Sequence, residues 1–65
     1  MDKILDHFDS IYDFENTLFR ADDAADNPID GDFMDEMLDM YEDCGEHMYL
    51  LASQADRIKK LSEGS

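Results

Sequence analysis

Carboxylates are the groups in this sequence that could do chemistry. The 65-residue chain has 18 aspartates and glutamates against 5 lysines and arginines, which gives a formal net charge of −13. Thirteen of the 18 acids are aspartate, a poorer former of helix interiors than glutamate. A surface of this kind repels nucleic acids and anionic membranes, so we expect neither as a direct partner.

The acids are concentrated in one part of the chain and recur there at helical spacing. Residues 1–43 hold 15 acids and 2 bases, whereas residues 44–65 hold 3 of each. Ordinary helix faces interleave acidic and basic residues, because like charges at i,i+4 destabilise a helix. Nearly unbroken carboxylate stripes therefore indicate a surface that recognises a binding partner. The acids that we predict to bind a partner are Asp2, Asp6, Asp9, Asp13, Asp22, Asp23, Asp26, Asp30, Asp32, Asp35, Glu36, Asp39, Glu42, Asp43 and Glu46.

The density of these carboxylates is close to that of a phosphate backbone. Duplex DNA carries about one charge per 1.7 Å of its axis, and two to four parallel stripes with one carboxylate per roughly 5 Å would reach a similar density. In small size, acidity and helical character, the chain resembles the DNA-mimicking inhibitors of bacteriophages and mobile elements. The resemblance implies that the chain occupies the basic groove of a host DNA- or RNA-binding protein and excludes its substrate.

A second hypothesis belongs to a different class of protein. A small dimeric helical adaptor would bind its partner through an apolar surface of Met, Tyr and Leu residues, and its acidity would serve solubility. Neutralising the stripes should then leave partner binding intact, whereas mutating Tyr49 and Leu50 should abolish it.

The same residue types also invite a metal or catalytic interpretation, which the spacing does not favour. Asp26 could open an EF-hand loop, but Pro28 and Met37 stand where that loop needs oxygen ligands, so weak divalent binding at the connector is left open. Cys44 and His47 are three apart, yet a zinc site needs four ligands. No glycine-rich phosphate loop or catalytic triad spacing is present. We expect no enzymatic activity, no cofactor and no dedicated metal site.

The elements that position these acids follow from the apolar pattern. Apolar series at 4/11/18 and 5/12/19 predict a first helix over residues 2–21, followed by an acidic connector over 22–32. A seam with alternating spacings of three and four predicts a second helix over 33–61, which begins after Asp32 as N-cap and continues through Gly45, and then a short tail over 62–65. The seam residues are Met34, Met37, Tyr41, Cys44, Met48, Leu51, Ala55 and Ile58.

These elements predict an all-α, single-domain protein. A two-helix antiparallel hairpin covers only one side of each apolar stripe, so we expect two chains to form a four-helix bundle. The predicted dimer or apolar interface consists of Met34, Met37, Tyr41, Met48, Tyr49, Leu50 and Leu51. Cys44, the single cysteine, is expected in the core, and its lack of a partner in the chain favours a reducing, cytoplasmic location. No apolar run approaches the roughly 20 residues of a membrane span.

Overall fold

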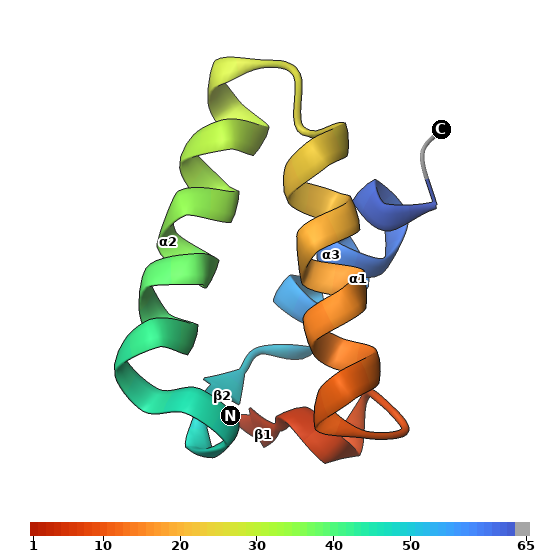
Figure 1. Ribbon diagram of the computed structural model, residues 1–65, viewed down its shortest axis with the longest axis vertical. Helices are drawn as coiled ribbons and strands as arrows, with labels where there is room; N and C mark the ends of the chain where they lie inside the picture. Colours follow the sequence, from red (N-terminus) through yellow and green to blue (C-terminus); the bar gives the residue numbers. More distant parts are fainter. Residues whose placement is uncertain (64–65) are drawn as a thin grey trace.

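Three helices make up most of the chain, as the computed structural model shows for residues 1–63 (Figure 1). The prediction of an all-α protein is confirmed. These residues also form a small two-stranded sheet and two short 3-10 helices. In chain order the elements are β1 (Asp2–Lys3), η1 (Ile4–Asp6), α1 (Ile11–Ala24), α2 (Pro28–Cys44), η2 (Gly45–His47), β2 (Tyr49–Leu50) and α3 (Ala52–Ser62).

The first helix begins later than the apolar series predicted. Ser10 has extended backbone angles and its Oγ accepts a hydrogen bond from the Asp13 backbone N–H at 3.0 Å, so it is the N-cap of α1. Residues 2–6 form β1 and η1 instead of helix, and the prediction of one helix over 2–21 is wrong at its N-terminal half. The inward stripe of α1 is therefore Phe14, Leu18 and Ala21, all fully buried.

The second predicted helix begins earlier than expected. Asn27, not Asp32, is its N-cap: the Asn27 Oδ1 accepts from the Asp30 backbone N–H at 2.9 Å. Pro28 then occupies the first helical turn, where its fixed φ angle suits a helix and its missing N–H costs nothing. The predicted connector over 22–32 shrinks to residues 25–27, and Asp32 lies inside α2.

Gly45 ends α2, so the prediction of one continuous helix over 33–61 is wrong. Its φ of +59° and ψ of −137° lie in a region that L side chains rarely adopt, and the chain turns there into η2 and β2. A third helix, α3, starts at Ala52. It ends at Ser62 with Lys59 and Lys60 in its last turn, where positive charge is favourable. Of the predicted tail over 62–65, residues 64 and 65 lie outside the described residues.

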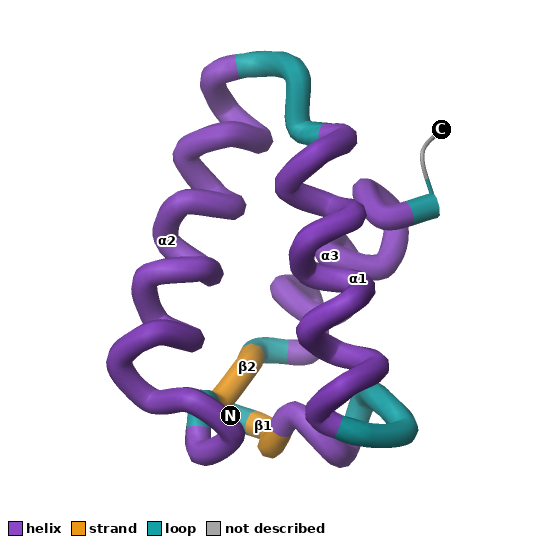
Figure 2. The backbone as a smooth tube through the Cα atoms, viewed as in Figure 1, coloured by secondary structure: helices purple, strands orange, loops and turns teal. Residues whose placement is uncertain are grey.

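α3 changes how the apolar surface is covered. It packs closely against α1, behind that helix in the view of Figure 1, while α2 runs antiparallel beside α1, and β1 pairs antiparallel with β2 at the end of the molecule that holds the N-terminus (Figures 1 and 2). The side chains between these elements form one hydrophobic core. Its buried residues are Ile4, Phe8, Phe14, Leu18, Ala21, Met34, Met37, Met48, Leu50, Ala55 and Ile58.

The seam residues are thus shared among three elements of one chain. Of the predicted dimer interface, Met34, Met37, Met48 and Leu50 are fully buried within the chain and Tyr41 is half-buried. Tyr49 and Leu51 remain half exposed. Covering the seam therefore requires no second copy, which removes the reason for predicting a four-helix bundle.

Large side chains bridge the wider gap between α1 and α2. The Phe14 ring makes edge-on contacts with Phe8 and with Tyr41 of α2, with ring centroids 5.0 and 5.3 Å apart. Arg57 of α3 connects to α2, because its guanidinium lies 4.3 Å from the Phe33 ring centroid and binds Asp30 at 2.9 Å.

Among residues 1–63, none of the helices combines the length and the apolarity needed to cross a membrane.

Candidate protein-binding surface

The exposed face of α2 is almost entirely acidic. Met34 and Met37 of this helix face the core, and Phe33, Leu38, Met40 and Tyr41 are half-buried around them. From residue 32 to the end of the helix, every exposed residue except Cys44 is acidic. These residues, which we call the acidic face, are Asp32, Asp35, Glu36, Asp39, Glu42 and Asp43.

The acidic face lacks basic partners. Within residues 1–63, the ion pairs are those of His7 with Asp2, Arg57 with Asp30, and Lys60 with Asp56. No carboxylate of the acidic face takes part in them. At 1.5 Å per residue, six carboxylates from Asp32 to Asp43 occupy about 16 Å of helix, or roughly one per 3 Å, close to the 3.4 Å per charge of one DNA strand.

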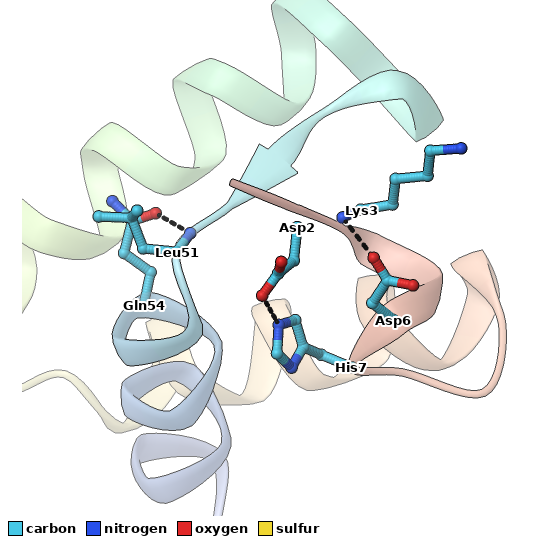
Figure 3. A network of polar contacts seen from close by, with 6 residues as sticks. All are labelled: Asp2, Lys3, Asp6, His7, Leu51 and Gln54. Carbon is cyan, nitrogen blue, oxygen red and sulfur yellow. Dashed lines mark hydrogen bonds and ion pairs between the residues drawn. The ribbon is translucent and has the colours of Figure 1, made fainter.

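The predicted acids outside α2 do not form a second helical stripe. Asp2 binds the His7 Nε2 at 2.9 Å and Asp6 accepts from the Lys3 backbone N–H at 3.0 Å, so both serve the fold at the N-terminal end (Figure 3). Asp9 lies in the turn before α1, and Asp13 lies in the first turn of that helix. The predicted stripe fails because residues 2–9 are not part of α1.

Other predicted acids lie where two helices meet. Asp22 and Asp23 are exposed in the last turn of α1, and Asp26 is exposed in the connector. Asp30 is half-buried and structural: hydrogen bonds from Arg57 and, to a lesser extent, from the Asn27 side chain hold the pKa of its carboxyl below the ordinary value of 3.8. Glu46 is exposed in η2, beyond the acidic face.

Several of these acids occupy positions that weaken the helices carrying them. Asp22 and Asp23 lie at the negative C-terminal end of α1, and Glu42 and Asp43 lie at the corresponding end of α2. Neither last turn contains a basic residue. Acids at such positions each cost about 0.3–1 kcal/mol at low ionic strength, so these positions do not serve stability.

A groove runs beside the acidic face, between α1 and α2. It has a volume of about 940 Å³. Three apolar or aromatic side chains line it together with four acids of α2. The lining residues are Phe19, Leu38, Tyr41, Asp35, Glu36, Asp39 and Glu42.

Phe19 and Leu38 are the site residues that sequence analysis missed. The 5/12/19 series placed Phe19 in the core, yet its side chain is 53% exposed at the groove. Numbering the pattern from the Ser10 cap would have separated Phe19 from the buried stripe of Phe14, Leu18 and Ala21.

Cys44 is another correction. The heptad seam placed it in the core, but it is exposed at the last position of α2, because the helix ends there and the seam does not continue in phase. Asp30 to Asp32 are helical, so they do not form a cation-binding loop. Within residues 1–63, no group of three or more His, Cys, Asp or Glu side chains is arranged to hold a metal ion.

Comparison of the chain with protein-family models, with curated proteins and with solved structures found no match.

Proposed function

We propose that the protein is an acidic mimic of nucleic acid, which binds the basic groove of a DNA- or RNA-binding protein and excludes the nucleic acid from it. The observation that carries this proposal is the acidic face of α2: six exposed carboxylates, evenly distributed over about three turns and free of basic partners within residues 1–63. A lysine- and arginine-lined groove offers these carboxylates the ion pairs that the chain itself lacks.

The cost of the arrangement supports the same conclusion. Solubility could be achieved with acids spread over the surface and paired with bases along each helix. Here the acids of α2 repel one another, and Glu42 and Asp43 also oppose the helix dipole. Binding to a basic groove would relieve both kinds of repulsion, so energy lost in the free protein is recovered in the complex.

The adaptor hypothesis has less surface available than the sequence indicated. Its apolar residues lie mostly in the core of one chain, and Tyr49 and Leu51 are the two that stay half exposed. The apolar seam from which the homodimer was predicted is likewise covered mostly within one chain. Light scattering of the purified protein decides its oligomeric state, and we expect a monomer.

The test is capture of the partner from a nuclease-treated lysate on tagged protein, with elution by a salt gradient or by duplex DNA. The test variant replaces four acids of the acidic face: Asp32→Asn, Asp35→Asn, Asp39→Asn and Asp43→Asn. The control variant removes the same charge from exposed acids elsewhere: Asp9→Asn, Asp22→Asn, Asp23→Asn and Asp26→Asn.

We expect a nucleic-acid-binding protein that is released by salt and by DNA, because DNA competes for the same basic groove. The test variant should lose this partner, while the control variant should retain most of it. A partner that withstands high salt and ignores DNA, or one that both variants bind equally, would refute the proposal.

A further inference from the structure

The groove between α1 and α2 differs from the acidic face beside it because it combines charge with an apolar floor. Phe19 of α1 lines the groove on one side, and Leu38 and Tyr41 of α2 line it on the other. Phe19 is 53% exposed, although burying it would be favourable. Asp35 and Asp39 stand at the rim, one helical turn apart.

A pure mimic of the phosphate backbone needs no such floor. Carboxylates alone reproduce the charges of DNA, and an apolar groove adds nothing to an interaction with lysine and arginine head groups. The combination instead matches a ligand that has both apolar and basic side chains on neighbouring positions.

We propose that the groove receives an amphipathic basic helix of the partner protein. Its apolar side chains would pack on Phe19 and Leu38, and its lysines and arginines would pair with the carboxylates at the rim. This inference rests on the proposed function, since it describes the part of the partner's basic groove that the acidic protein recognises.

The length of the groove suits a helix. The lining acids of α2 run from Asp35 to Glu42, eight residues whose seven helical rises span about 10.5 Å along the axis. Apolar residues at i, i+3, i+4 and i+7 of a partner helix span the same distance, so one short helix can follow the groove over two turns.

The groove also gives the acidic protein a means of discrimination. Charge alone attracts every basic surface and weakens with salt. Apolar contacts at Phe19 and Leu38 do not weaken with salt, so they would select partners that carry apolar residues within a basic surface.

The test uses two labelled peptides of about 15 residues, long enough for four helical turns. The first has leucines at i, i+3, i+4 and i+7 with lysines and arginines on the flanks, and the second is a scrambled peptide of identical composition and charge. Fluorescence anisotropy at about 0.15 M salt, a Debye length near 8 Å, gives the Kd of each. We expect the amphipathic peptide to bind at least about tenfold more tightly than the scrambled one.

Matched variants locate the binding. Phe19→Ser should weaken binding of the amphipathic peptide by about tenfold, whereas Leu5→Ser, a change at a 60% exposed side chain of η1 outside the groove, should not change its Kd. Asp35→Asn with Asp39→Asn should weaken binding more than Asp9→Asn with Asp26→Asn, which removes the same charge from exposed acids that do not line the groove. Circular dichroism verifies that each variant is folded.

Equal affinity for the two peptides, or an unchanged Kd in Phe19→Ser, would overturn the inference. Neither result would affect the proposed function, which competition by duplex DNA decides separately. Selective binding of the amphipathic peptide with no competition by DNA in the lysate experiment would have the opposite meaning: the groove would bind basic helices, and mimicry would be refuted.

Discussion

Tyr41 is the residue at which the core, the groove and the acidic charge meet. Its ring packs edge-on against Phe14, and its hydroxyl donates a hydrogen bond to the Glu15 Oε2 at 3.4 Å. Burial, together with the negative charges of Glu15 and Glu46, raises the pKa of the Tyr41 hydroxyl above its ordinary value of 10.0, because each of these opposes formation of the phenolate.

Because of this raised pKa, the stability of the protein should fall at alkaline pH. A folded-state pKa above the unfolded value means that the contribution of Tyr41 is complete below pH 10.0 and is lost as the pH rises through the folded pKa. In a titration of absorbance at 295 nm, the curve of the native protein minus that of Tyr41→Phe should have its midpoint above 10.0. Glu15→Gln should lower this midpoint only in part, since burial is the larger cause. A difference curve centred at 10.0 would contradict the arrangement of these side chains.

At the scale of elements, Gly45 decides the architecture, because its conformation separates α2 from the segment that returns to α3. An added Cβ at Gly45 would meet no atom within 4 Å, so the cost of Gly45→Ala is purely that of its backbone angles. We expect Gly45→Ala to lower the free energy of unfolding by about 1–3 kcal/mol, the cost of holding an L residue in a sparsely populated backbone region, and each kcal/mol corresponds to a fall in Tm of about 4–8 °C for a domain of this size.

Gly31 provides the matched control for this prediction. It also has open space around it, but it lies inside α2 with an ordinary helical φ. Gly31→Ala should therefore raise the free energy of unfolding by about 0.5–1 kcal/mol, since alanine loses less conformational freedom in a helix. Urea denaturation followed by circular dichroism measures both values. An unchanged or raised stability of Gly45→Ala would show that Gly45 is not a helix stop.

The helices and their ends show how much of the fold could be predicted from the sequence. Periodicity correctly predicted an all-α protein and the inward positions of Leu18, Met34 and Met37. It missed the breaks at Ser10 and Gly45, because apolar residues that belong to separate elements happened to keep heptad spacing across both breaks. The Ser10 cap and the positive φ of Gly45 each depend on a single residue, so a seven-residue repeat cannot reveal them.

The candidate surface was predictable only where local sequence determines it. The six acids of the acidic face lie together because their spacings of three and four residues return to one side of a helix, and the sequence pattern alone indicated this. The groove depends on the distance between α1 and α2, which Phe14 and Tyr41 set by packing across the gap. That contact joins residues 27 positions apart. Periodicity counted from the Ser10 cap could therefore exclude Phe19 from the buried stripe, but it could not place Phe19 opposite Leu38 and Tyr41.

For the molecule as a whole, the net charge of −13 links stability to function. Mutual repulsion among unpaired carboxylates favours the expanded, unfolded chain, and salt screens this repulsion. We expect the Tm of the native protein to rise between about 0.02 and 0.5 M NaCl, as the Debye length falls from about 20 Å to about 4 Å. Differential scanning calorimetry at several salt concentrations measures the slope.

The two four-aspartate variants distinguish the cost of the charge from its use. Each removes four carboxylates and changes the net charge from −13 to −9, so both should have a higher Tm than the native protein at low salt and a smaller dependence on salt. Only the variant in the acidic face should lose the partner, because only those carboxylates would contact the basic groove. A surface kept at the expense of stability is typical of a functional site. If neither variant gains stability at low salt, the acids are ordinary solvated side chains, and repulsion no longer supports a role in binding.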